Sequence, residues 1–423
     1  MNRFLDIRSY FQGVGFAFRA MHSKNFKLFF FGQIVSLLGT WIQNIALGWL
    51  VYRLTNSVFL LGVVGFAGQI PSLLITPLAG VFADRINRRN VMLATQMAFM
   101  VLAFLLAALV LLNVVQVWQI ILLATLNGVV LAIDTPFRHA FLLVMVGDKS
   151  LLQNAIALNS TLINSARFIG PTVGGILIAL MGEGWCFFIN GISFLAVIGA
   201  LLAMVVVDVQ PEGEKKSIIA DLREGLRYSF NFVPIRYLLV LVATTSFFGL
   251  PFQVFMPVYA KDILGGGAEL LGFLTGAMGA GALVGAFYLA SRKNICGIPN
   301  LILLTAAIFS VGLIGFAFST ITFLSLILIF FIGFGMIVEF ASTNTLLQTI
   351  VDEDKRGRVV SLYSMSFMGI TPLGSLLLGS LSHEWGVDVV LFVSGIFCLL
   401  AVGLYARRVP VISRVVRSIN ECA

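Results

Sequence analysis

The stretch Gly80-Val-Phe-Ala-Asp84-Arg85-Ile-Asn87-Arg88-Arg89 lies between two apolar runs, each long enough to cross a lipid bilayer as a helix. It therefore places one acid and three bases in a short connection on one side of a membrane. A related arrangement without the acid follows 205 positions later, where Gly285 precedes Ser291-Arg292-Lys293. This spacing predicts a membrane protein built from two related halves.

The composition supports the membrane assignment, because 59% of the 423 residues are hydrophobic and only 11% are charged. The net charge of +8 lies in the loops, where the positive-inside rule accounts for it, so we expect no nucleic-acid partner. The four cysteines have neither paired spacing nor neighbouring histidines, which predicts no disulfide framework, no metal site and no cofactor. The basic N-terminus lacks a small-residue cleavage pattern, so we expect no removable signal peptide.

Hydropathy predicts an all-α polytopic membrane protein with twelve transmembrane helices. The predicted spans are 28–52, 58–82, 91–112, 117–137, 155–180, 185–207, 236–260, 268–290, 299–318, 321–347, 359–382 and 387–406. Twelve spans put both termini on one side of the membrane. Only Arg53 and Lys261 fall in the opposite loops and Arg167 falls within a span, so the other 24 of the 27 Lys and Arg lie on the terminal side. This asymmetry predicts cytoplasmic termini.

The longest connection, residues 208–235, separates two sets of six spans and ends in the apolar spacing of an amphipathic helix. The predicted parts are a cytoplasmic N-terminal segment 1–27, a six-helix bundle 28–207, the cytoplasmic loop 208–235, a second six-helix bundle 236–406 and a cytoplasmic tail 407–423. A constant offset of 205 pairs Gly80 with Gly285, Gly128 with Gly333 and Asp134 with Glu339. The constant offset favours an internal repeat over chance alignment. Two such pseudo-symmetric bundles would enclose a substrate cavity between them.

The motif Gly80-x-x-x-Asp84-Arg85-x-x-Arg88-Arg89 resembles the signature loop between the second and third helices of the major facilitator superfamily. The span number, the central loop and the doubled halves extend this likeness over nearly the whole chain. The resemblance implies the major facilitator fold and a charge network, Asp84 with Arg88 or Arg89, that holds the halves closed on the cytoplasmic side. Topogenic charge alone would explain the arginines but not Asp84 at this spacing. Asn87 stands where the family usually has Gly, and Asn tolerates the left-handed backbone that such a turn needs.

Gly170-Pro171-Thr-Val-Gly174-Gly175 in the fifth span is similar to the antiporter motif of drug and proton exchangers in this superfamily. Ala157 and Ala166 occupy two positions at which the longer family pattern has Gly. Small residues let helices approach closely, and Pro171 removes one backbone donor. Ordinary helix packing needs the same residues, so the motif fits both an exchanger and a packing site.

Three charged residues fall within or near the ends of predicted spans. Arg167 lies about 18 Å into the fifth span, near mid-bilayer, where its charge requires a partner, either an anionic substrate or a polar neighbour. Asp134 and Glu339 occupy matching places near the cytoplasmic ends of spans four and ten, and either carboxylate could carry a proton during exchange. Arg138, four residues after Asp134, can neutralise that acid, so Glu339 is the first candidate. Ala124 stands where the superfamily often has a basic residue in span four.

Polar side chains at helical spacing predict a solvated cavity. In the first span Gln33, Ser36, Thr40 and Gln43 recur at steps of three and four, with Asn44 beside them. Such a stripe is typical of a helix that lines a water-filled space. Further candidates for the cavity are Asn127, Asn164, Arg167, Gln253 and Asn344. For any single amide, hydrogen bonding between helices is the alternative.

Lys24-Asn-Phe-Lys27-Leu-Phe, Gln69-Ile-Pro71 and Asp134-x-Pro136-x-Arg138 look like patterns of the enterobactin exporter and macrolide efflux branch of the superfamily. The resemblance implies a monomeric bacterial inner-membrane exporter of a siderophore-like or amphipathic drug-like molecule, working by alternating access and proton antiport.

A lysophospholipid flippase and a metal-ion exporter of the same fold are alternatives. A membrane-embedded lipid enzyme is disfavoured, because the three histidines are far apart and no Gly-x-Ser-x-Gly or His-Glu-x-x-His occurs. The chain also lacks the phosphate-binding loop of an ATP-driven pump. We therefore expect a protein that is not an enzyme.

Overall fold

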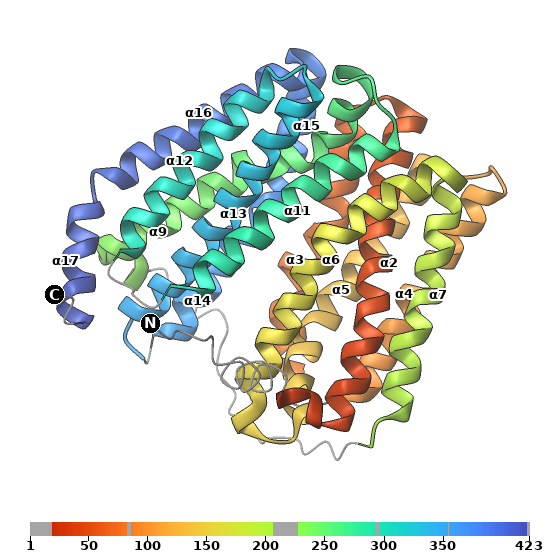
Figure 1. The fold of residues 1–423 in the computed structure, drawn as a ribbon, viewed down its shortest axis with the longest axis horizontal. Coiled ribbons are helices and arrows are strands. Elements are labelled where there is room, and N and C mark those ends of the chain that lie inside the picture. Colours follow the sequence, from red (N-terminus) through yellow and green to blue (C-terminus); the bar gives the residue numbers. More distant parts are fainter. Residues whose placement is uncertain (1–18, 83–85, 206–226, 293–296, 354, 421–423) are drawn as a thin grey trace, which may run out of the picture.

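A computed structural model of the chain describes residues 19–82, 86–205, 227–292, 297–353 and 355–420. Helices are the only regular elements in these residues, and twelve of them, counting broken helices as one, are long and apolar enough to cross a membrane. The predicted all-α fold with twelve spans is confirmed. Figure 1 shows two bundles that lean against each other, the first running from red to yellow-green and the second from green to blue.

The first bundle contains six long helices and two short 3₁₀ turns. Its elements are η1 (Arg19–His22), α2 (Lys24–Thr55), α3 (Val58–Phe82), α4 (Arg88–Leu111), α5 (Val117–Val146), η2 (Lys149–Leu151), α6 (Leu152–Met181) and α7 (Glu183–Ala203). Helix α5 extends beyond its predicted span of 117–137 to Val146, because Pro136, Arg138 and His139 interrupt the apolar run in the sequence but do not end the helix.

The second bundle contains four continuous spans and two interrupted ones. Its elements are α9 (Val233–Thr244), η3 (Thr245–Gly249), η4 (Leu250–Phe255), α10 (Met256–Val258), η5 (Tyr259–Ile263), α11 (Ala268–Ala290), α12 (Ile298–Ala317), α13 (Thr322–Ile350), α14 (Arg356–Ser364), η6 (Met365–Gly369), α15 (Thr371–Trp385) and α16 (Val387–Ala406).

The C-terminal tail forms a further helix, α17 (Val409–Asn420), which the sequence analysis had described only as a tail. Val409, Ile412 and Val416 are buried against the ends of α12 and α13, while Arg414 and Arg417 are exposed. This apolar spacing of three and four residues is visible in the sequence and marks an amphipathic helix. The predicted amphipathic helix of the central loop lies mostly outside the described residues.

Two sharp turns repeat between the halves. Gly182 joins α6 to α7 with φ 83°, and Gly386 joins α15 to α16 with φ 84°, a left-handed conformation that glycine adopts without strain. The expected left-handed backbone at Asn87 is wrong, because its φ is −58°. Asn87 instead accepts a hydrogen bond from the Asn90 backbone N–H and caps the start of α4, a role for which asparagine is well suited.

The seventh span, predicted at 236–260, is present at Val233–Ile263, but it is not one continuous α-helix. Residues Val233–Ile263 run as α-helix, then a π turn (η3), a 3₁₀ segment (η4), a short α turn and a second π turn (η5). Pro251 and Pro257 lack the backbone N–H that a regular helix uses, and π and 3₁₀ turns accommodate them. Broken backbone at membrane depth is tolerated where it is buried in protein or lines a cavity.

Both described chain ends lie at the same end of the molecule, here called the terminal end; the other is the distal end (Figure 1). The bundles touch mainly through α3 against α15 and α6 against α11. Close backbone contacts between glycines of the two bundles, Gly62 with Gly379 and Gly175 with Gly272, lie in the distal halves of these helices. Figure 1 shows the bundles diverging toward the terminal end.

Candidate functional site

A cavity of about 440 Å³ lies between the two bundles. The first bundle contributes α2, α3, α4 and α5, and the second contributes η4, α10 and α11. The wall is mostly apolar with a few polar groups, which is the usual character of a small-molecule site. The cavity is lined by Trp41, Gln43, Asn44, Ile45, Leu47, Gly48, Val51, Leu61, Val64, Gly65, Gly68, Gln69, Leu102, Leu106, Ile120, Leu123, Ala124, Asn127, Leu131, Gln253, Val254, Met256, Pro257, Leu271, Thr275 and Met278.

Four of the ten predicted cavity residues line this space, namely Gln43, Asn44, Asn127 and Gln253. Gln253 reaches it because the interrupted seventh span places the 3₁₀ segment η4 against the cavity. Trp41, Gln69 and Thr275 also line the cavity and are not among the cavity residues predicted from the sequence. Gln69 was predicted only as part of a family pattern, although an amide one turn after Gly65 and two residues before Pro71 on the apolar second span also indicated a polar face.

The other predicted cavity residues lie elsewhere. Gln33 and Ser36 are 2% and 4% exposed, so the first half of the polar stripe is packed between helices. Thr40 donates to the Ser36 carbonyl, Asn164 donates to the Ser160 carbonyl, and Asn344 accepts from Gln348. The stripe on α2 therefore divides in two, because only its distal part faces the space between the bundles.

Arg167 lies behind the cavity wall. Its guanidinium is 5.4 Å from the centroid of the Trp41 ring, a cation–π contact, and Trp41 itself lines the cavity. Arg167 Nε is buried and has no hydrogen-bond partner among the described residues. Within the described residues this charge contacts an aromatic ring, which is neither the anionic substrate nor the polar neighbour expected from the sequence.

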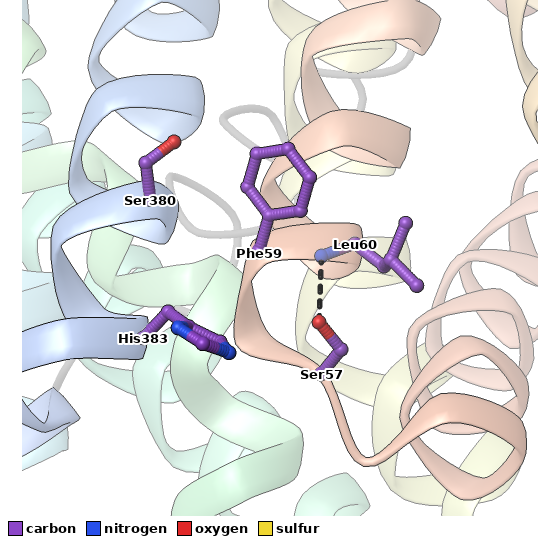
Figure 2. Close-up of a pocket in the computed structure, with 5 residues that line it drawn as sticks. All are labelled: Ser57, Phe59, Leu60, Ser380 and His383. Atoms are coloured by element: carbon purple, nitrogen blue, oxygen red, sulfur yellow. Dashed lines mark hydrogen bonds between the residues drawn. The ribbon is translucent and has the colours of Figure 1, made fainter.

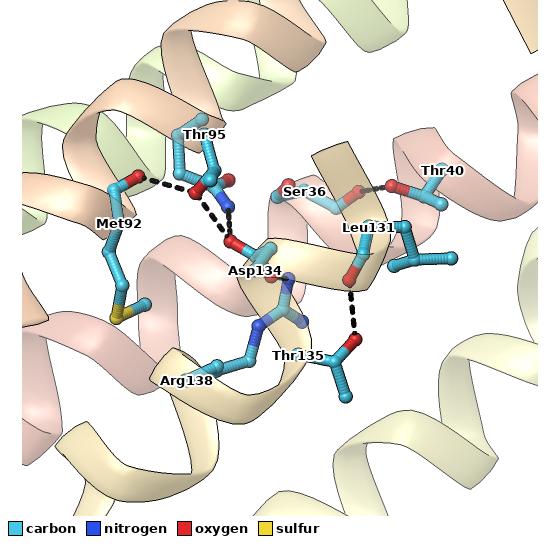
Figure 3. A network of polar contacts seen from close by, with 9 residues as sticks. Ser36, Thr40, Met92, Thr95, Leu131, Asp134, Thr135 and Arg138 are labelled. Atoms are coloured by element: carbon cyan, nitrogen blue, oxygen red, sulfur yellow. Dashed lines mark hydrogen bonds and ion pairs between the residues drawn. The ribbon is translucent and has the colours of Figure 1, made fainter. Parts of the chain in front are cut away.

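Asp134 is fully buried in a polar network within the first bundle, and both of its carboxylate oxygens have partners (Figure 3). Its Oδ1 accepts from Thr95 Oγ1 at 2.7 Å and from Gln96 Nε2 at 2.9 Å, and its Oδ2 pairs with Arg138. The ion pair is the one that the spacing of four residues predicted. A carboxylate with all these partners is well suited to hold α4 and α5 together.

Glu339 is fully buried in the second bundle and has fewer partners. Its Oε1 accepts from Thr245 Oγ1 at 3.0 Å, and its Oε2 has no hydrogen-bond partner in the described part of the chain. Thr245 is the first residue of the π turn η3, eight positions before Gln253 in the cavity wall. Glu339 does not line the cavity, but it contacts the interrupted span that does.

The motif on α6 packs this helix against two others. An ideal Cβ on Gly170 would lie 2.4 Å from Trp41 Cβ, and one on Gly174 would lie 3.1 Å from Ile42 Cα, so both positions admit close approach of α2. A Cβ on Gly175 would lie 2.8 Å from Gly272 Cα in the other bundle. Pro171 is buried inside the helix. The motif therefore packs α6 both within its own bundle and across the interface.

The charged loop is only partly described. Asp84 and Arg85 lie outside the described residues, and Gly80 lies near the end of α3. Arg88 is buried, and Arg89 donates from Nε and Nη2 to the carbonyls of Leu201 and Leu202 at 2.8 and 2.9 Å. These carbonyls belong to the last turn of α7, whose free acceptors favour a cation. Arg89 is thus tied to its own bundle.

Four polar residues join the bundles at the distal end, and we call them the distal cluster: Tyr52, Asn56, Lys261 and Asp262. Tyr52 Oη donates to Asp262 Oδ2, and Lys261 Nζ donates to Asn56 Oδ1 at 2.7 Å. Lys261 Nζ also lies 5.3 Å from the centroid of the Tyr52 ring. None of these four residues is predicted from the sequence as part of a site, although Lys261 is one of the two bases predicted on the side opposite the termini.

Beside the distal cluster, Arg53 forms an ion pair within the first bundle. Its Nε lies 2.6 Å from Glu183 Oε1 and its Nη2 lies 3.2 Å from Oε2, which joins the end of α2 to the start of α7. A shallow groove of about 350 Å³ also lies at the distal end, between α3 and α15 (Figure 2). It is lined by Ser57, Phe59, Leu60, Ser380 and His383.

No group of three or more His, Cys, Asp or Glu side chains suited to a metal ion occurs among the described residues. The described cysteines, Cys186 and Cys398, are buried and not in disulfides.

Comparison with known proteins places this architecture in a family. The family described as transmembrane secretion effector matches residues 16–419. The staphyloferrin A transporter of Staphylococcus aureus (strain NCTC 8325 / PS 47) is 27% identical over 390 residues, covering 90% of this chain and 96% of the relative. The multidrug efflux pump Tap of Mycolicibacterium fortuitum is 25% identical, covering 90% and 95%. Macrolide efflux protein A of Streptococcus pyogenes is 23% identical, covering 89% and 96%.

Solved structures share the fold at low sequence identity. The nucleoside transporter NupG superposes with a TM-score of 0.71 at 11% identity, covering 91% of this chain and 98% of that one. A bacterial homolog of the human lysosomal transporter Spinster, in an inward-facing and unoccupied conformation, gives a TM-score of 0.69 at 14% identity, covering 93% and 98%.

Proposed function

Because the chain belongs to the transmembrane secretion effector family of major facilitator transporters, we propose that it is a secondary exporter of an organic small molecule, driven by proton antiport. The observation that carries this proposal is the mixed polar and apolar cavity between two six-helix bundles. Relatives named for siderophore transport and for drug efflux support a siderophore-like or amphipathic drug-like cargo.

The orientation follows from the charge asymmetry of the sequence. With the terminal end in the cytoplasm of a bacterial inner membrane, the bases of the terminal loops obey the positive-inside rule. The structure then corresponds to a state whose distal, external side is closed. Cargo enters the cavity from the cytoplasm of a monomeric transporter, and rocking of one bundle on the other exposes it to the outside.

The contacts that must change in this cycle are specific. The distal cluster and the glycine contacts between α6 and α11 hold the external side closed, so they separate when the cavity opens outward. The resemblance-based network of Asp84 with Arg88 or Arg89 would then close the cytoplasmic side.

Glu339 is the residue that we assign to proton coupling. Burial of a carboxyl group with one unpaired oxygen favours its uncharged form, and charging it would alter its bond to Thr245 at the start of η3. Because η3 leads directly into η4, a change at this bond is transmitted along one interrupted helix to Gln253 in the cavity wall. Asp134, with its full set of partners, is assigned a structural role.

Counterflow in proteoliposomes tests the proposal. The purified full chain is reconstituted with a panel of siderophores, macrolides and lysophospholipids, each with and without a pH gradient. We expect exchange of a siderophore-like or drug-like compound. Its transport should be faster when the proton gradient drives protons in the direction opposite to the cargo. Exchange of lysophospholipids alone would identify a flippase, and exchange that ignores the gradient would reject proton antiport.

A further inference from the structure

The polar part of the cavity wall is made of neutral groups. Five side-chain amides line it, and Thr275 adds a hydroxyl; the amides are Gln43, Asn44, Gln69, Asn127 and Gln253. Apart from the indole N–H of Trp41, every other residue in the wall, within the part of the chain that the structure describes, is apolar or glycine. The amides come from α2, α3, α5 and η4, so they approach the space from both bundles.

These amides are available to a ligand. Gln43 Oε1 accepts from Asn190 Nδ2 at 2.8 Å, which leaves the Gln43 amide N–H groups free. The side chains of the other four have no hydrogen-bond partner among the described residues. Each amide carries both hydrogen-bond donors and acceptors. A ligand that forms hydrogen bonds with these groups in an apolar wall therefore binds with a more favourable free energy.

The wall offers no counter-charge. Arg167 contacts the wall residue Trp41 through its guanidinium, which lies 5.4 Å from the ring centroid, but Arg167 itself does not line the cavity. An ion entering this space would lose hydration without gaining an opposite charge, which is unfavourable. A neutral ligand with carbonyl, amide or hydroxyl groups loses less hydration and matches the amides.

We infer that the cavity selects electrically neutral, amphipathic molecules that carry several amide, carbonyl or hydroxyl groups, and that it discriminates against both anions and cations. This inference rests on the proposed export function and names the class of its cargo. The cavity of about 440 Å³ suits a drug-sized molecule, since such sites span about 300–1,000 Å³.

A matched set of fluorescent probes tests the inference. Dansylglycinamide is neutral, dansylglycine carries a carboxylate and dansylethylenediamine carries an ammonium group, while the shared dansyl ring brightens in an apolar site. Each is titrated against the full chain in nanodiscs, with empty nanodiscs subtracted. We expect the neutral probe to bind at least about tenfold more tightly than either charged probe. Equal or tighter binding of a charged probe, or no binding of the neutral one, overturns the inference.

Two variants locate the selectivity in the cavity. Gln253→Glu and Gln69→Glu place a carboxylate on opposite bundles, and each should improve ammonium binding at least about tenfold and weaken carboxylate binding further. Gln153→Glu is the matched control, because Gln153 is exposed at the start of α6 outside the cavity. If neither cavity variant changes the order of the probes while both remain folded by circular dichroism, the amide wall does not set selectivity. Unchanged order in that case overturns the inference.

Transport of the same probes separates this inference from the export proposal. Selective binding of dansylglycinamide without counterflow would reject export and leave the selectivity standing. Counterflow of dansylglycine in preference to dansylglycinamide would support export and reject neutral selectivity. Loss of that preference in Arg167→Gln would then identify Arg167 as the anion contact.

Discussion

At the scale of single residues, two buried acids at matching sequence positions have opposite surroundings. Asp134 has three side-chain partners, including a base, whereas Glu339 has one hydroxyl and an unpaired oxygen. A buried carboxylate whose oxygens all have partners is suited to stabilising the fold. A buried carboxylate with an unpaired oxygen is the better candidate for binding and releasing a proton. The two residues therefore predict different phenotypes.

Substitution of Glu339→Gln should remove gradient dependence from transport. The amide keeps the shape and can still accept from Thr245, but it cannot exchange a proton. We expect the gradient-driven rate to fall to the rate without a gradient, with counterflow at equal pH retained. Glu353→Gln is the control, since Glu353 is exposed at the terminal end. A variant whose rate still responds to the gradient would remove Glu339 from the coupling mechanism.

Substitution of Asp134→Asn should destabilise the fold. The substitution leaves Arg138 without its ionic partner. Losing one member of a buried ion pair lowers the free energy of unfolding by about 3–5 kcal/mol, and we expect about 3 kcal/mol because the Arg138 side chain is 24% exposed. The measurement is thermal unfolding in detergent, followed by tryptophan fluorescence. The double variant Asp134→Asn/Arg138→Met should recover part of the loss. A single variant as stable as the parent chain would show that the pair contributes nothing net.

At the scale of elements, the sequence predicted helices well and their interruptions poorly. Apolar runs locate all twelve spans because burial in lipid requires them over about 20 residues. The π turns η3 and η6 depend on how prolines and bulky neighbours pack in three dimensions, and hydropathy does not encode this. The same limit explains the cavity: helical spacing identified the stripe on α2, but bundle packing decided that Gln43 faces the space and Gln33 does not.

The glycine contact between α6 and α11 should be sensitive to one methyl group. In Gly175→Ala the new Cβ would lie 2.5 Å from the Ala268 carbonyl oxygen and 2.8 Å from Gly272 Cα, so the helices must separate. We expect the distal-closed state to lose about 1–3 kcal/mol relative to the distal-open state. The shift is measured as faster labelling of a cavity reporter, Thr275→Cys, by an impermeant maleimide added from the distal side.

The control for this substitution is Gly199→Ala. An alanine Cβ at Gly199 would meet nothing within 4 Å. The substitution should therefore only stabilise helix α7, by about 1 kcal/mol, because alanine has a higher helix propensity than glycine. Labelling of the reporter should be unchanged in this control. Equal labelling in both variants would mean that the glycine contact does not keep the distal side closed.

At the scale of the whole molecule, the two ends carry different kinds of contact. The described residues of the charged terminal loop are tied within one bundle through Arg89 and α7, whereas the distal cluster joins one bundle to the other. The sequence resemblance drew attention to the terminal loop and gave no equivalent signal for the distal cluster. Residues that join distant parts of a chain share no local spacing, so only the folded arrangement brings Tyr52 to Asp262.

Disruption of the distal cluster should open the external side. In Lys261→Met/Asp262→Asn the bridge to Asn56 and the charged acceptor for Tyr52 are both lost, while the helices keep their apolar packing. The partly buried bond from Tyr52 to the charged Asp262 contributes about 1.5–3 kcal/mol, and the exposed Lys261–Asn56 bond contributes less, so the equilibrium should move toward the distal-open state by about tenfold or more. The cavity reporter Thr275→Cys, in a chain with Cys296 and Cys422 replaced by Ser, should then react faster with maleimide from the distal side and more slowly from the terminal side.

The matched control is the neighbouring ion pair within one bundle. Arg53→Gln/Glu183→Gln removes a contact of similar strength at the same end, but both residues belong to the first bundle. Rigid rocking of the bundles leaves that pair intact, so labelling from either side should match the parent chain. If both double variants accelerate distal labelling equally, the distal end loosens by local unfolding. If only the cluster variant does so, and its terminal labelling slows in parallel, opening of one side is coupled to closing of the other through movement of whole bundles.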